Sequence, residues 1–400
     1  MNRGSIVPAV WTSTALAMIY SSYSFAQSTP SEFAEMSLTD LFEQTIDDPS
    51  VSHPDRSPWS FTFQRKSAEF KDFLEGDNRV SEDEVLWSGP KSGEPRTDKN
   101  FPVVPGKIVQ TAYLISLGYA FNDSWRGHVT VPYLEQNTDH ISIVPNYSTF
   151  EIESSGVGDT VVSASYRLSD TERANWWVTV GLSIPTGSID EEGDTPRAPG
   201  DQQLPYTMQL GSGTYDFPIE ISYHSKGNHD ISLALAALIR SGTNDNDYRL
   251  GNSYSLAGRY NFHFSEILQP YIGLNVNYTD SIHGADTSLM VDSPYPYPAP
   301  ITNPDLFGGT KIGARAGISW QVSDHYRLAV EIGKPIYQNL MGPKTRKTCR
   351  VPFQFHGPSK QKRPRSLVFY LARYAYFFLW WSWCPVTVRA PSPIDYSFLC

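Results

Sequence analysis

Ionisable side chains recur at alternate positions in several stretches of this sequence. Thirteen stand on the polar side of such an alternation: Arg126, His128, Asp159, Arg167, Asp216, Glu220, His224, Arg259, His263, Lys311, Arg315, Arg327 and Glu331. Lining a lumen, such acids and bases would set ion selectivity and the field along a narrow channel. They can instead pair with one another and fill a closed interior. Their mixed signs argue against a strongly ion-selective pore.

Enzyme signatures are sparse by comparison. The sequence contains no Gly-x-Ser-x-Gly elbow, no His-Glu-x-x-His pair and no phosphate-binding loop. Ser222 and His224 point to the same side of one stretch but lack a recognisable third partner. We therefore expect no enzyme and no cofactor, with a barrel-embedded lipid hydrolase as the alternative. The acidic runs 190–194 and 244–247 lack the spacing of a calcium loop, so we expect solvated loops and no metal.

The elements that position these side chains are strands, because apolar and polar residues alternate with a period of two. The clearest case sets Tyr215, Phe217 and Ile219 against Asp216 and Glu220. Ten strands follow this pattern, and 59–63 begins an eleventh; the ten are 109–121, 125–133, 159–168, 176–184, 214–224, 231–239, 254–264, 269–278, 311–322 and 326–332.

Strand length and connection length point to a membrane. A tilted strand crosses a bilayer with about 9 to 11 residues, which most of these stretches match. Short turns such as 122–124 alternate with long connections, which are 134–156, 185–213, 241–252 and 279–309. The apolar face is too continuous and aromatic to meet water, so the polar face is enclosed. The sequence predicts an all-β fold, a transmembrane antiparallel up-and-down β-barrel of twelve strands with the last one missing or altered.

The two ends of the chain differ from the barrel. Residues 1–26 have the layout of a secretory signal peptide cut after Ala26, with an N-terminal membrane anchor as the alternative. We expect a periplasmic segment over 27–57 and the barrel over 58–343. Residues 344–400 hold ten of the 32 Lys and Arg residues, one acid and all three cysteines. We interpret this basic tail as translated out of frame; the alternative is a genuine appendage.

Several short glycine-rich motifs suggest a family. They are GVGDT at 156–160, IPTG at 184–187, LGSGTYD at 210–216, GKP at 333–335 and NLMGP at 339–343. Residues 107–343 thereby resemble the outer-membrane barrels grouped under the meta-pathway of phenol degradation. The resemblance implies a transporter of aromatic or other hydrophobic compounds. The closing strand expected in that family has no clear counterpart after residue 343.

The function predicted from these observations is an outer-membrane channel that passes small hydrophobic or aromatic compounds by passive diffusion. We expect it in a Gram-negative outer membrane with a periplasmic N-terminus. Its expected partners are membrane lipids, the solutes and the barrel-assembly machinery. Nucleic acid is not expected, since residues 1–343 hold 22 bases and 41 acids. The alternatives are the lipid hydrolase and a structural barrel with a filled lumen.

Overall fold

The computed structural model describes residues 58–87, 95–226, 230–262, 264–265, 267–323, 326–350 and 353–357. The predicted signal peptide and periplasmic segment lie outside the described residues, and so does the tail from residue 358. Among the described residues, no helix is long and apolar enough to cross a membrane.

Twelve antiparallel strands form a closed ring, which confirms the predicted barrel. In ring order the first eleven strands are β1 (Trp59–Gly76), β3 (Val103–Ala120), β4 (Trp125–Ser142), β6 (Thr160–Asp170), β7 (Ala174–Ile184), β10 (Asp216–Ser225), β11 (Asp230–Arg240), β13 (Ser253–Asn261), β14 (Leu268–Thr279), β16 (Gly309–Ser323) and β17 (Tyr326–Arg350). A closed ring satisfies every backbone group of its wall, as a hydrocarbon environment requires.

The twelfth strand is built from residues 344–357. The element β17 reverses its direction near Gly342, whose φ of 146° favours glycine. After the reversal, the backbone of Lys347 lies beside Gln338, whose side chain bonds both Lys347 N and Lys347 O at 3.0 Å. Residues 344–350 then pair with β1, and β18 (Phe353–Gly357) continues the pairing.

The predicted barrel limit at residue 343 is therefore too early. A short alternation of Phe353 and Phe355 with Gln354 and His356 pairs with residues 61–65 of β1. The basic run before it hid this strand, because Lys and Arg are atypical of a membrane-facing strand. Whether the tail is translated out of frame stays a prediction.

Each strand presents an apolar side outward and a polar side inward. On β13, Tyr254 and Leu256 are 40% and 52% exposed, while Ser253 and Ser255 are 2% and 4% exposed. The same contrast recurs around the ring, with large aliphatic and aromatic side chains exposed and Gln, Ser, Asn and charged side chains buried. This arrangement reverses that of a water-soluble protein and suits a wall between lipid and a polar interior.

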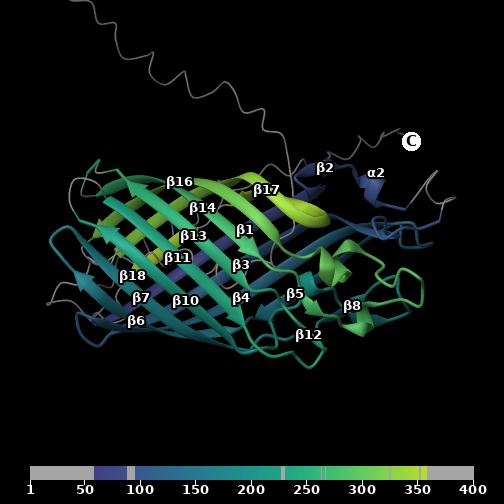
Figure 1. Ribbon diagram of the computed structural model, residues 1–400, viewed down its shortest axis with the longest axis horizontal. Coiled ribbons are helices and arrows are strands. Elements are labelled where there is room, and N and C mark those ends of the chain that lie inside the picture. Colours follow the sequence, from purple (N-terminus) through teal and green to yellow (C-terminus); the bar gives the residue numbers. More distant parts are fainter. Residues whose placement is uncertain are drawn as a thin grey trace, which may run out of the picture. The chain divides into compact units, whose positions relative to one another are not determined.

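Smaller elements gather at the end of the barrel that carries the long connections (Figure 1, right). The predicted connection 134–156 is largely a hairpin, because β4 extends beyond the ring and pairs with β5 (Thr149–Val157). The remaining small elements are β2 (Asn78–Val80), α2 (Glu82–Val85), β8 (Glu192–Asp194), β9 (Asp201–Gln203), η3 (Tyr206–Met208), β12 (Tyr248–Arg249), β15 (His283–Gly284), η4 (Thr287–Leu289), η5 (Pro300–Thr302) and η6 (Pro304–Leu306).

Four buried apolar clusters draw on these connections and the strand ends beside them. Their members are Phe73, Val85, Leu86, Phe101 and Val104; Tyr206, Tyr248, Ile282, Leu289 and Phe307; Val103, Ile108, Ala299 and Ile301; and Ile152, Leu204 and Met208. Most of the conventional hydrophobic core of the described chain thus lies at the mouth, while the barrel interior is polar.

Candidate functional site

The inner wall of the barrel carries most of the predicted site residues. Asp216, His224, Lys311, Arg315 and Glu331 are buried, each 9% exposed or less. The half-buried ones are Arg126, His128, Arg167, Glu220, Arg259 and Arg327. His263 lies outside the described residues. Asp159 is buried in the turn between β5 and β6, and so belongs to the mouth.

One sector of the wall, over β6 to β11, holds charges that are matched by partners. Asp216 is fully buried and forms an ion pair with Arg240 at 2.5 Å. Arg167 forms an ion pair with Asp170 at 2.7 Å. We call this sector the paired wall. Charges arranged in this way stabilise a defined geometry and leave little net field.

A buried tryptophan is the centre of a second group in this sector. The guanidinium of Arg126 lies 4.3 Å from the ring centroid of Trp177, and that of Arg167 lies 5.7 Å from it. Trp177 alternates with a second tryptophan, Trp176, that is exposed on the outer face. The sequence shows two adjacent tryptophans, but nothing in it predicted that Trp177 would stack against Arg126 and Arg167.

Positive side chains outnumber negative ones on the inner face of β13, β14, β16 and β17. We call this sector the cationic wall. Its inner face carries Arg259, Lys311, Arg315 and Arg327 against the single carboxylate of Glu331. Arg259 donates to Asn261 Oδ1 at 2.6 Å, and its guanidinium lies 3.6 Å from the ring centroid of Tyr271. The hydroxyl of Tyr271 hydrogen-bonds the carboxylate of Glu331.

Arg315 differs from its neighbours on this wall. It is 8% exposed, and its Nε and Nη2 have no hydrogen-bond partner among the described residues. Arg327, by contrast, donates from Nε to Gln321 Oε1 at 3.0 Å. Buried guanidinium nitrogens without acceptors are costly, so Nε and Nη2 of Arg315 call for a partner that the described part of the chain does not supply.

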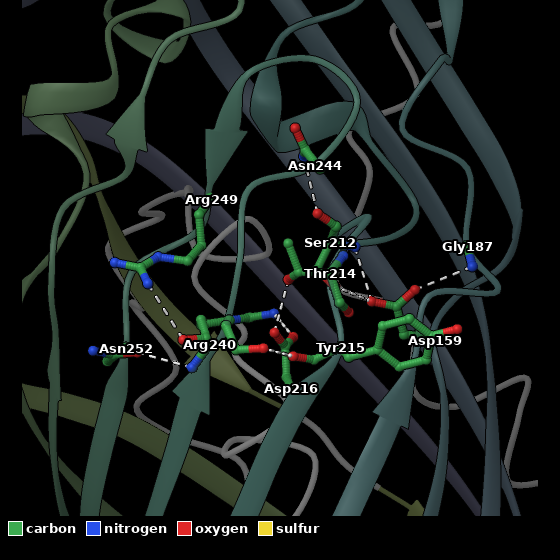
Figure 2. A network of polar contacts seen from close by, with 11 residues as sticks. Asp159, Gly187, Ser212, Thr214, Tyr215, Asp216, Arg240, Asn244, Arg249 and Asn252 are labelled. Carbon is green, nitrogen blue, oxygen red and sulfur yellow. Dashed lines mark hydrogen bonds and ion pairs between the residues drawn. The ribbon is translucent and has the colours of Figure 1, made fainter.

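The mouth is held by a polar network around two aspartates (Figure 2). Asp159 accepts hydrogen bonds from Ser212 Oγ at 2.6 Å, Ser212 N at 2.8 Å and Gly187 N at 3.1 Å. Asp216 accepts from Thr214 Oγ1 at 2.7 Å. These hydrogen bonds fix residues 212–214 to the end of the barrel that carries the long connections.

Burial raises the pKa of the Asp159 carboxyl above its usual range, although the hydrogen bonds from Ser212 and Gly187 and the charge of Arg240 oppose this effect. The carboxyl is therefore easier to protonate than an exposed aspartate. Because Asp159 joins the connection 185–213 to the β5–β6 turn, its role in the structure is to anchor a loop.

The same connection folds inward against the strands. Ser154 Oγ donates to Met208 O at 2.6 Å, and Gln110 and Gln136 donate to Thr207 O and Gln209 O, each at 3.1 Å. Neither Gln110 nor Gln136 was among the residues predicted from the sequence to form the site. Their direct opposition across β3 and β4 was the signal that could have found them.

Three aromatic rings join the long connections to one another. Tyr206 contacts Tyr248 and Phe307, with ring centroids 4.8 Å and 5.6 Å apart. Its hydroxyl oxygen accepts a hydrogen bond from Asp286 N at 2.9 Å. These contacts place an apolar cluster, with the ring of Tyr206 at its centre, among the loops of the mouth.

His224, the histidine of the alternative hydrolase pair, contacts a serine of the neighbouring strand. His224 Nδ1 lies 3.1 Å from Ser232 Oγ on β11. Ser222 and His224 stand two positions apart on β10, roughly 6 to 7 Å along an extended strand. Within the described ranges, no group of three or more His, Cys, Asp or Glu residues is placed to bind a metal ion.

Comparison with known proteins gives structural neighbours. No family model matches the chain, and no curated protein matches its sequence. The outer membrane channel from Pseudomonas putida F1 is 16% identical, with 76% of this chain and 96% of that one covered and a TM-score of 0.48. The TodX monoaromatic hydrocarbon channel, as a deltaS2 mutant, is 7% identical, with 76% and 91% covered and a TM-score of 0.41.

A Pseudomonas aeruginosa FadL homologue is 11% identical, with 76% of this chain and 90% of that one covered and a TM-score of 0.37. All three scores lie below 0.5. The closed ring of twelve strands is therefore established by the pairings within this chain. The resemblance to the barrels of the phenol meta-pathway stays a prediction.

Proposed function

We propose that this barrel is an outer-membrane channel that passes small hydrophobic or aromatic compounds by passive diffusion. The proposal includes export by residues 1–26, a periplasmic N-terminus and delivery by the barrel-assembly machinery. An even number of strands supports the orientation, because it returns both ends of the barrel to one side of the membrane.

The incomplete hydrogen bonding of the inner wall is the observation that carries the proposal. Among the described residues, Gln64 Oε1, Asn175 Oδ1, Ser183 Oγ and two nitrogens of Arg315 are buried without a hydrogen-bond partner. A barrel whose interior were filled by its own side chains would satisfy such groups internally, because buried polar atoms are rarely left unbonded. Water enclosed beside these atoms would bond them instead, once the side chains that cover them move.

The apolar character of the solute is inferred from the mouth. The rings of Tyr206, Tyr248 and Phe307 are 2% exposed or less within the connections at the mouth, so a solute would contact them only when those connections move. Apolar and aromatic side chains line most small-molecule sites, with few polar groups for orientation. A solute that moves from this cluster to a polar interior must tolerate both environments, which favours small compounds with a limited polar part.

Reconstitution of the mature chain tests the channel directly. Planar bilayers measure ionic conductance, and liposomes loaded with an absorbing reporter measure entry of toluene, phenol and glucose. We expect stepwise conductance, and faster entry of phenol than into liposomes without the protein, because phenol also crosses a bare bilayer. A folded barrel with neither conductance nor uptake would refute the channel.

The structural barrel with a filled lumen is the second candidate function. The inward-folded segment 204–210, buried along its whole length, favours it. Conductance separates the two candidates, because a barrel closed by this segment conducts only after the segment is released. Replacing Gln136 with Ala removes a donor to Gln209 O, and conductance that appears only in this variant would support the closed state.

A further inference from the structure

The cationic wall contains a geometry that calls for an anion. Arg259 on β13 and Arg315 on β16 both stand opposite Gly273 of the intervening strand β14. With neighbouring strands about 4.8 Å apart, their Cα atoms lie roughly 10 Å apart on one inner face. Two arginine side chains can therefore reach the same point above Gly273.

Gly273 is what allows this approach. A Cβ added there would lie 2.6 Å from Nε and 3.0 Å from Cγ of Arg315. The arginine side chain thus lies directly over the glycine, in the space that any larger residue would occupy. The side chain of Arg315 therefore extends from β16 over β14, the strand that separates it from Arg259.

The charges around this point do not balance. Lys311 and Arg327 lie on the same wall, and two carboxylates act on Arg259: Glu331 of β17 and Asp230 at the start of the neighbouring strand β11, which leaves the four cations in excess. The carboxylate of Glu331 is engaged by the hydroxyl of Tyr271, and Arg259 is engaged by Asn261 and the Tyr271 ring. Arg315 is left with two buried nitrogens that donate to no atom in the part of the chain that the structure describes.

We propose that Arg315, together with Arg259, forms a binding site for an organic carboxylate within the barrel. A guanidinium presents paired N–H groups that match the two oxygens of a carboxylate. The excess positive charge of the cationic wall favours an anion over water as the partner of Arg315. The site deepens the proposed function, on which its substrate assignment rests: the solutes include small aromatic acids in their anionic form.

Direct binding tests the site apart from transport. The folded full-length barrel in detergent micelles is titrated with benzoate and, in parallel, with benzamide, which has the same shape and no charge. We expect saturable binding of benzoate and much weaker binding of benzamide. Arg315→Gln should weaken benzoate binding by at least about tenfold, the effect of losing hydrogen bonds to a charged partner.

Two further variants distinguish the site from a general loss of charge or of fold. Gly273→Ala keeps both arginines but displaces Arg315, and should weaken benzoate binding while the folded barrel persists on gels. Arg327→Gln removes the same charge from the same wall at a guanidinium that already has an acceptor, and should change binding by less than about threefold.

The outcomes separate this inference from the channel itself. Benzoate binding without conductance would remove the proposed function and keep the site. Conductance with no saturable benzoate binding, or with equal binding in Arg315→Gln and the unaltered chain, would overturn the site and leave water as the partner of Arg315. Equal losses in Arg315→Gln and Arg327→Gln would also overturn it, because charge alone would then explain the binding.

Discussion

The paired wall and the cationic wall belong to the same ring and follow the same alternation, yet they treat charge differently. In the paired wall the buried carboxylate of Asp216 meets Arg240 at 2.5 Å. In the cationic wall two buried nitrogens of Arg315, Nε and Nη2, meet no acceptor among the described residues. Both residues stand at inward positions of strands that the sequence predicts equally well.

This difference shows that pairing and selectivity are not exclusive roles for the charges of one lumen. From the sequence, the thirteen candidates either pair and fill the interior or line a selective channel. The structure provides pairs in one sector and an unmatched guanidinium in another. We infer that the first sector stabilises the barrel and that the second meets the solute.

The largest expected effect is the loss of the closed barrel, and with it the loss of both walls. Residues 344–357 close the ring between β17 and β1, so a chain ending at residue 343 should fail to form a closed barrel. A chain ending at residue 357 keeps every described strand and should fold. Heat-modifiable migration on gels after refolding in lipid measures the difference. Equal folding of the two chains would contradict the closure described here.

Breaking the central pair of the paired wall should have the next largest effect. Asp216→Ala leaves Arg240 buried and uncompensated, and should lower the free energy of unfolding by about 3 to 5 kcal/mol. Replacing Arg240 with Met in the same chain should restore part of the loss. Urea unfolding in lipid vesicles, followed by tryptophan fluorescence, measures both changes.

Asp170→Ala is the matched control for this experiment. Asp170 pairs with Arg167 and Lys226, but its side chain is 36% exposed. Its loss should cost less than about 1 kcal/mol, as is usual for exposed pairs. If Asp170→Ala costs as much as Asp216→Ala, burial does not distinguish the pairs and the paired wall is not a structural unit.

Charge reversal in the cationic wall should change ion selectivity by a smaller free energy. One unit charge about 10 Å from an ion in water changes its energy by about 0.4 kcal/mol. Arg315→Glu changes the wall by two charges and acts on the two ions in opposite directions, so the chloride-to-potassium permeability ratio should fall by up to about sixteenfold, and by less in salt that screens the charge. Reversal potentials in planar bilayers under a salt gradient measure the ratio.

The paired wall supplies the control. Joint replacement of Asp216 by Asn and Arg240 by Gln removes one charge of each sign, and should leave the permeability ratio unchanged. A ratio that changes equally in both variants would mean that the two walls contribute alike to the field in the lumen.

Much of this fold follows from local physics. Alternation with a period of two identified eleven strands, because each strand separates lipid from a polar interior along its whole length. The closing strand was missed, since its basic first half does not alternate and only Phe353 to His356 does. The hairpin that extends β4 was also missed, because β5 pairs outside the ring and follows no membrane constraint.

The candidate site, like the fold, could be predicted only as far as it depends on alternation along single strands. The inward position of Arg259 and Arg315 follows from alternation, but their approach over Gly273 depends on the register of three strands. Asp159 was placed on the polar side of a strand and lies instead in a turn that anchors the mouth. Register and loop packing join residues far apart in sequence, and the spacing of residues in a single sequence does not determine either.

The smallest expected effect concerns the response of the mouth to acid. The pKa of Asp159 is raised in the folded chain, chiefly by burial. A group of this kind contributes stability that is complete below its unfolded pKa and is lost as the pH rises through the folded pKa. Lowering the pH from about 7 to about 4.5 should therefore tighten the anchor of the connection 185–213, in contrast to carboxylates whose pKa is depressed by ion pairs.

Hydrogen–deuterium exchange of residues 210–215 at the two pH values, corrected for intrinsic exchange rates, measures this response. Asp159→Asn keeps an oxygen acceptor near Ser212 and removes the titration, so protection in this variant should not depend on pH. Ser212→Ala removes a donor to Asp159 and should reduce protection at both pH values. Faster exchange of the unaltered chain in acid would contradict the sign, and would show that the ionised carboxylate, with its bonds to Ser212 and Gly187, is the form that holds the mouth.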